Sequence, residues 1–111
     1  AEYRSFLRDV LAVSRQFQVV GEAQDGLETV RLAKSLQPDV AIIDVHMPRM
    51  TGLEAIPKLQ AASPSTVVIL VSISEEPEYY RTAQAAGARA FIPKLSLSAE
   101  RLLEVLGLPN R

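Results

Sequence analysis

Residues 39–45 read Asp-Val-Ala-Ile-Ile-Asp-Val and give the clearest indication of a strand in the chain. This segment is apolar at almost every position, which suits a strand buried on both faces of a parallel sheet. A second run of the same kind, Thr-Val-Val-Ile-Leu-Val-Ser, lies at residues 66–72. A shorter apolar segment at residues 90–92 predicts a further strand of the same sheet.

Helix signals lie between these strands. Asp25 provides an acidic helix cap, Thr51 opens a capping box, and Ser74 and Ser98 cap two later helices. Pro57 falls inside the helix that Thr51 opens, where we expect a kink or a frayed first turn.

The segment before Asp25 predicts one more helix and one more strand. Residues 3–14 carry an apolar stripe of helical spacing that contains Phe6, Leu7, Val10 and Leu11. Residues 18–23 follow as a short strand. The resulting order, α-β-α-β-α-β-α-β-α, is typical of a doubly wound α/β sheet with right-handed parallel crossovers.

Composition limits the classes of function. The 111 residues are the length of a single domain. Twelve Lys and Arg against thirteen Asp and Glu give a net charge of −1, which argues against a nucleic-acid surface or a polybasic membrane patch. The chain contains no cysteine, and no apolar run reaches the roughly 18 residues of a membrane-spanning helix. We therefore expect a cytoplasmic protein without disulfides or thiolate metal sites.

Three polar residues end the predicted strands. Asp44 and Ser72 close the two long apolar runs, and Lys94 follows the third. In an open α/β sheet, ligands bind beyond the carboxyl ends of the strands, so the three side chains are expected at one edge. A carboxylate that attacks phosphorus, an ammonium that offsets charge and a hydroxyl donor suit a phosphoryl acceptor. Each residue taken singly also has an ordinary structural explanation. Asp44 could cap a backbone amide, Ser72 could hydrogen-bond within its own turn, and Lys94 could be a solvated surface amine.

The segment from Asp39 to Glu54 resembles the phosphoacceptor segment of response-regulator receiver domains of two-component systems. The resemblance rests on a hydrophobic strand, then Asp44, two residues, Met47-Pro48, and Gly52-Leu53-Glu54. Later landmarks match in order and spacing: Val71-Ser72, Ala85-Ala86-Gly87-Ala88 and Phe91-Ile92-Pro93-Lys94. The resemblance covers residues 1–111 as a single receiver domain. Within the family, the chain is most similar to the branch with LuxR-type helix-turn-helix output domains.

The resemblance implies a role for each matching residue. Asp44 would be the phosphorylation site and a magnesium ligand, and the backbone carbonyl of His46 would be a second ligand. Ser72 would hydrogen-bond the phosphate, Lys94 would pair with it, and Phe91 would turn from exposed to buried when Ser72 moves.

The resemblance also implies partners. A sensor histidine kinase would phosphorylate Asp44, and the phosphorylated domain would form a homodimer. The domain would control transcription, and DNA would be contacted only through an output domain outside this sequence. No membrane contact and no turnover enzyme activity are expected.

Two features depart from the family pattern. The implied flavodoxin-like sheet has five strands in the order 2-1-3-4-5, and its first strand, which ends in an acidic pair that holds magnesium, is absent from residues 1–111. We expect that strand to lie upstream of Ala1, and we expect magnesium binding without it to be weak or absent. In addition, Leu95 follows Lys94 where many receivers have proline.

Two other functions remain as alternatives. A phosphate-independent pseudo-receiver would use the same fold as a protein-interaction module, and the missing acidic pair favours it. A hydrolase with an aspartate nucleophile, as in haloacid-dehalogenase-like phosphatases, would need a second aspartate two residues after Asp44. That position is His46, which argues against the hydrolase.

Overall fold

A computed structural model of the chain describes residues 2–45, 50–72 and 77–108. In these residues, three parallel strands form one sheet in the order β1 (Val40–Asp44), β2 (Val67–Ser72) and β3 (Ala90–Pro93). The register sets Ile42 beside Ile69, and Leu70 beside Phe91. The predicted strands at 39–45, 66–72 and 90–92 are thereby confirmed.

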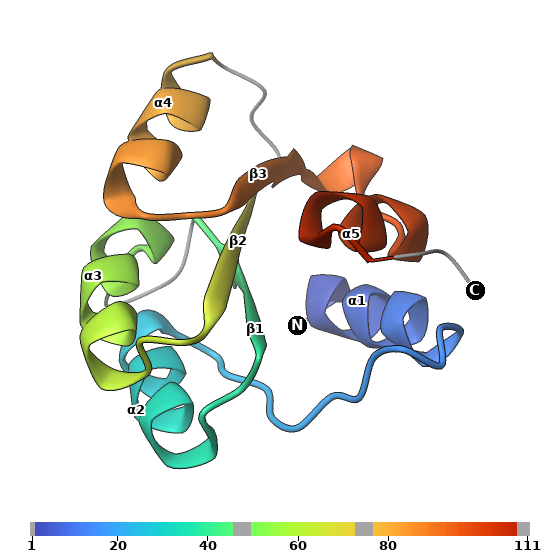
Figure 1. Ribbon diagram of the computed structural model, residues 1–111, viewed down its shortest axis with the longest axis horizontal. Coiled ribbons are helices and arrows are strands. Elements are labelled where there is room, and N and C mark those ends of the chain that lie inside the picture. Colours follow the sequence, from blue (N-terminus) through green and yellow to red (C-terminus); the bar gives the residue numbers. More distant parts are fainter. Residues whose placement is uncertain (1, 46–49, 73–76, 109–111) are drawn as a thin grey trace.

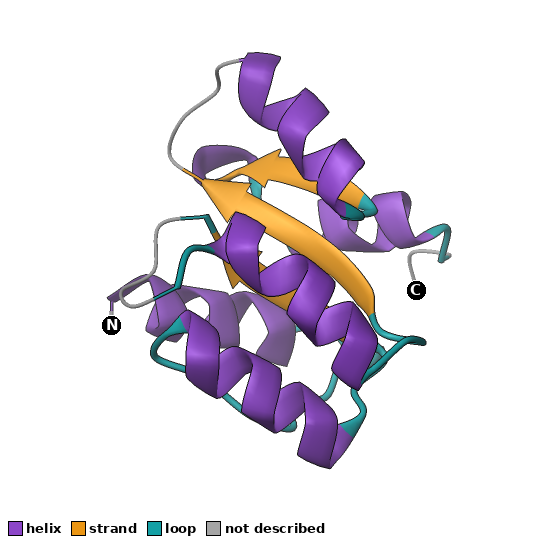
Figure 2. Cartoon of the chain, turned by 90° about the vertical axis from the view of Figure 1, so that its left-hand side faces the viewer, coloured by secondary structure: helices purple, strands orange, loops and turns teal. Residues whose placement is uncertain are grey.

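The helices cover both faces of this sheet. Figure 1 shows α1 (Glu2–Ala12) and α5 (Ala99–Leu106) on one side, and α2 (Gly26–Leu36), α3 (Gly52–Ala62) and α4 (Pro77–Ala86) on the other. Figure 2 shows α2 and α3 side by side in front of the sheet. A 3-10 turn, η1 (Lys94–Ser96), joins β3 to α5. The arrangement is the predicted doubly wound α/β fold.

The strands contribute side chains to two hydrophobic clusters, because successive side chains of a strand point to opposite faces of the sheet. The cluster on the side of α1 and α5 contains Ile69, Val71, Ile92, Leu97 and Leu102. The cluster on the side of α2, α3 and α4 contains Ala33, Ile43, Val45, Ile56, Leu59, Val68, Leu70, Ala83, Ala88 and Phe91. Burial on both faces explains why β2 is apolar at every position before Ser72.

Most of the predicted helix caps are present. The Asp25 side chain accepts a hydrogen bond from the Glu28 N–H at 2.9 Å, and Thr51 and Glu54 form a reciprocal capping box. The Ser98 hydroxyl accepts from the Arg101 N–H at 3.0 Å. Ser74, the remaining predicted cap, lies outside the described residues. The helix α3 runs through Pro57 as one continuous helix.

Residues 18–23 do not form the predicted strand. They are irregular, and β1 pairs only with β2 among the described residues. A strand is stabilised by hydrogen bonds to a neighbouring strand, and no strand in the described part of the chain pairs with residues 18–23. They are separated from β1 by an open groove of about 780 Å³.

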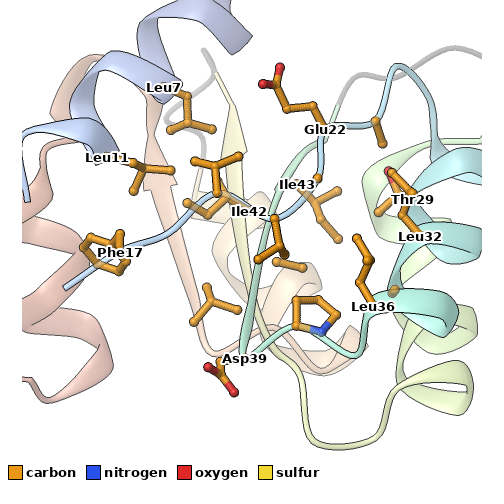
Figure 3. Close-up of a pocket in the computed structure, with 18 of the residues that line it drawn as sticks. Leu7, Leu11, Phe17, Glu22, Thr29, Leu32, Leu36, Asp39, Ile42 and Ile43 are labelled. Atoms are coloured by element: carbon orange, nitrogen blue, oxygen red, sulfur yellow. The ribbon is translucent and has the colours of Figure 1, made fainter. Parts of the chain in front are cut away.

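The groove is bordered by α1, residues 16–24, α2 and β1. Figure 3 shows Leu7 and Leu11 on one side, Leu32 and Leu36 on the other, and Ile42 between them. Several large apolar side chains that remain exposed line this groove, namely Val19, Val20, Leu36 and Leu108. Apolar surface is therefore gathered along the edge of β1 that has no strand partner among residues 2–45, 50–72 and 77–108.

The apolar stripe of α1 differs from the predicted one. Tyr3, Leu7 and Leu11 pack against the cluster on the α1 and α5 side, whereas Phe6 is 46% exposed. This partly buried stripe repeats every four residues and keeps the predicted Leu7 and Leu11, but it begins at Tyr3 instead of Phe6. Within the described residues, no helix has the length and apolar character needed to cross a membrane.

Candidate functional site

The carboxyl ends of the three strands bring the predicted polar residues to one edge of the sheet. Asp44 is the last residue of β1, Ser72 is the last of β2, and Lys94 directly follows β3. The register places Asp44 beside Val71, and Ser72 beside Pro93. Each polar residue therefore lies beside the residue that directly precedes the next polar one, and all three are at the same edge of the sheet.

Asp44 and Lys94 form an ion pair across the end of β2. The Lys94 Nζ donates a hydrogen bond to the Asp44 Oδ2. The Asp44 side chain is 26% exposed and that of Lys94 is 17% exposed. The carboxylate is thus reachable from solvent, and a positive charge already lies where negative charge would gather during phosphoryl transfer.

Ser72 and Phe91 lie deeper than the ion pair. Ser72 is fully buried at the end of β2. Phe91 is only 7% exposed and belongs to the cluster on the α2, α3 and α4 side. The ring is therefore already buried in this conformation, and the turn of Phe91 from exposed to buried on phosphorylation stays a prediction.

Tyr3 joins this site, although the sequence analysis did not assign it there. The Lys94 Nζ lies 4.3 Å from the centroid of the Tyr3 ring. The Tyr3 hydroxyl is buried without a hydrogen-bond partner among the described residues. Burial, and secondarily the charge of Asp44, raises the pKa of Tyr3 from 10.0 to about 12. The spacing of Tyr3, Leu7 and Leu11 was the sequence signal that could have indicated its inward direction.

Gly52, the first residue of α3, contacts the backbone at the end of β1. The Gly52 N–H donates to the Val45 carbonyl at 2.9 Å. A Cβ atom at Gly52 would overlap the Asp44 carbonyl oxygen and approach the Val45 Cα to 3.0 Å. The start of α3 therefore lies directly against the backbone of the candidate acceptor, a fit that only glycine allows.

A magnesium site is only partly represented in the described residues. Mg²⁺ is commonly bound by one or two carboxylates together with waters and phosphate oxygens. Asp44 supplies one such carboxylate at this edge. Among the described residues, no three His, Asp or Glu side chains are grouped closely enough to hold a metal ion. His46, the predicted carbonyl ligand, lies outside the described residues.

Comparison with known proteins shows which family this chain resembles in sequence and fold. Residues 1–106 match the family model described as response regulator receiver domain. The chain is 37% identical over 103 residues to the chemotaxis protein CheY of Listeria monocytogenes, covering 93% of this chain and 85% of CheY. The solved signal receiver domain of the response regulator NarL from Mycobacterium tuberculosis is 34% identical, with a TM-score of 0.86 and coverage of 95% and 85%.

Other relatives are longer proteins, and this chain matches only part of their length. The nitrate/nitrite response regulator NarL of Escherichia coli is 35% identical over 103 residues, which are 93% of this chain but 47% of NarL. The chain covers 26% of the protein-glutamate methylesterase of Pyrococcus abyssi, to which it is 36% identical. The predicted similarity to the LuxR-type branch is confirmed, and most of these relatives are regulators rather than enzymes.

Proposed function

This chain belongs to the response regulator receiver domain family of two-component systems, and on that premise we propose that Asp44 is the residue that accepts the phosphoryl group. The observation that carries the proposal is the ion pair between Asp44 and Lys94 at the carboxyl edge of the sheet. A carboxylate that is partly exposed and already paired with an ammonium has both the access and the charge compensation that phosphoryl transfer requires.

The proposed reaction is a transfer from a phosphorylated histidine of a sensor kinase. An Asp44 carboxylate oxygen attacks phosphorus, the bond between phosphorus and the imidazole nitrogen breaks, and the product is an acyl phosphate on Asp44. The Lys94 ammonium group then pairs with the phosphoryl oxygens instead of the Asp44 carboxylate, because the negative charge is now on those oxygens. The Ser72 hydroxyl donates a hydrogen bond to one of those oxygens once it moves toward them.

Bound Mg²⁺ would add positive charge at the phosphoryl oxygens. Asp44 would hold it together with the His46 carbonyl and with acidic residues outside this sequence. The described residues supply too few ligands by themselves, so we expect binding by residues 1–111 alone to be weak.

The proposed response is a change on the surface formed by α4, β3 and α5. Movement of Ser72 would alter the packing around Phe91, which lies on the adjoining strand two residues before Pro93, the register partner of Ser72. It would so bias a two-state surface. We propose that this surface mediates homodimerisation and that an output domain outside this sequence contacts DNA. The similarity to NarL supports control of transcription. The domain would act in the cytoplasm without turnover of a substrate.

We also propose that an extended segment upstream of Ala1 completes the sheet. The groove beside β1 supports this, since it is lined by apolar side chains and adjoins the strand edge that lacks a partner among the described residues. Unpaired buried backbone groups cost about 1–3 kcal/mol each. The proposed segment would pair with β1 and end in two acidic residues beside Asp44.

Acetyl phosphate and mass spectrometry test the proposed function. With Mg²⁺, the intact protein should gain the mass of one phosphoryl group. Lys94→Ala should slow this gain, because the compensating charge is lost. Adding the upstream segment to residues 1–111 should raise both the rate and the affinity for Mg²⁺.

The pseudo-receiver is the second candidate. It is favoured by the absence of a metal-binding group of side chains among the described residues. A protein that contains the upstream segment and still takes up no phosphoryl group, while it binds a partner normally, would establish this alternative.

A further inference from the structure

We propose that Tyr3 is a positioning residue for Lys94, holding the ammonium group against Asp44 during phosphoryl transfer. This inference rests on the proposed function of Asp44. It starts from the Lys94 Nζ, which lies between two partners: the Asp44 carboxylate and the face of the Tyr3 ring, 4.3 Å from its centroid. The negative face of an aromatic ring attracts a cation, and the attraction grows when water is excluded.

The lysine needs such a restraint. Its side chain is a flexible four-carbon stem with a compact charge, and a partly exposed ion pair alone restrains geometry weakly. The Tyr3 ring limits the positions open to the ammonium group on one side, while the carboxylate limits them on the other. Phosphoryl transfer depends on such positioning.

The position of the ring is fixed by α1. Leu7 and Leu11 pack in the same cluster as Tyr3, which holds the helix against the sheet. Five residues after Tyr3 on α1, Arg8 forms a bidentate ion pair with Glu22, with nitrogen–oxygen distances of 2.7 and 2.9 Å. The helix is thus held from two directions, and the ring is presented to Lys94 by a docked element rather than by a loop.

The buried Tyr3 hydroxyl indicates that the ring, rather than the hydroxyl, carries the role. Its oxygen is enclosed and lacks a hydrogen-bond partner among the described residues. A tyrosine selected for its hydroxyl would be expected to use it in the resting site. Phenylalanine should therefore replace Tyr3, whereas leucine should not.

Two measurements on the intact protein test the proposal with the variants Tyr3→Leu, Tyr3→Phe and Phe6→Leu. NMR measures the ring-current shift of the Lys94 side-chain protons without any phosphodonor. Mass spectrometry measures the rate of phosphoryl uptake from acetyl phosphate with Mg²⁺. Phe6 is the matched control, because it lies one turn away on α1, its ring is 5.7 Å from that of Tyr3, and its side chain is 46% exposed.

Tyr3→Leu should remove the shift and slow uptake about five- to thirtyfold, the range set by the strength of cation–π contacts. Tyr3→Phe should restore both quantities, and Phe6→Leu should leave both as in the wild type. Absence of the shift in the wild type, or uptake by Tyr3→Leu at the wild-type rate, would overturn the proposal. If the wild type shows the shift but takes up no phosphoryl group, the proposed function fails, and the role of Tyr3 in transfer fails with it.

Discussion

Gly52 packs directly against the backbone carbonyl of Asp44, so that the first residue of α3 touches the last residue of β1. A side chain at Gly52 would push into backbone atoms of Asp44 and Val45, neither of which can rotate away. The close approach fixes the start of α3 against the end of β1. The position of the candidate acceptor thus depends on a glycine that carries no functional group.

Gly52→Ala should destabilise the protein by about 1–3 kcal/mol, the usual cost of overpacking. It should also slow phosphoryl uptake, because the backbone of Asp44 must shift. Urea unfolding and acetyl phosphate kinetics measure the two effects. Gly21→Ala is the control, since a Cβ atom there would meet the end of the Leu36 side chain, which is partly exposed and can move. Equal stability of the two variants would contradict the tight contact at Gly52.

The capping box of α3 should make stability depend on pH. A hydrogen bond from the Thr51 backbone N–H, and then one with the Thr51 side chain, lowers the pKa of Glu54 below its usual value of 4.5. A carboxyl group with a lowered pKa in the folded state stabilises the fold above its unfolded pKa, and this contribution is lost as the pH falls through the folded value.

Thermal unfolding of wild type and Glu54→Gln measures this contribution. The amide keeps the hydrogen-bonding shape of the box but cannot carry charge. The wild type should have the higher melting temperature at neutral pH, and the gap should close in acid below about pH 4.5. A gap of constant size across this range would show that the charge of Glu54 is not used.

Tyr3 should stay protonated at a pH where ordinary tyrosines ionise. Burial raises its pKa to about 12, from the usual 10.0. Because its folded pKa is raised, the protein should lose stability as the pH rises from 10.0 toward 12. Between these values, tyrosinate absorbance of the native wild type should equal that of Tyr3→Phe. In denaturant, the wild type should show one more tyrosinate. A native difference of a full tyrosinate would contradict the burial of the hydroxyl.

The link between the site and the partner surface should depend on the Ser72 hydroxyl. Ser72→Ala should retain phosphoryl uptake but weaken phosphate-dependent dimerisation, because the buried side chain can no longer hydrogen-bond the phosphate. Mass spectrometry and analytical ultracentrifugation separate the two effects. A Ser72→Ala protein that dimerises like the wild type after phosphorylation would exclude the hydroxyl from the switch.

The sequence predicted those features that are encoded locally. Caps at Asp25, Thr51 and Ser98 depend on a side chain and the next three residues, and β2 is recognisable because it is buried on both faces. The shared edge of Asp44, Ser72 and Lys94 followed from the parallel topology alone.

The failures involve contacts between distant segments. Residues 18–23 have the composition of a strand, but a strand also needs a partner, and none lies beside them in the described residues. The contact between Tyr3 and Lys94 depends on how α1 docks, which no motif around either residue records.

Chemical trapping of the product shows directly whether Asp44 carries the phosphoryl group. Borohydride reduces an acyl phosphate on aspartate to homoserine, which peptide mass spectrometry locates in the chain. After treatment with acetyl phosphate and Mg²⁺, we expect homoserine at residue 44 in the wild type and no homoserine in Asp44→Asn. Homoserine at another aspartate, or equal phosphoryl uptake by Asp44→Asn, would contradict the assignment of Asp44 as the acceptor.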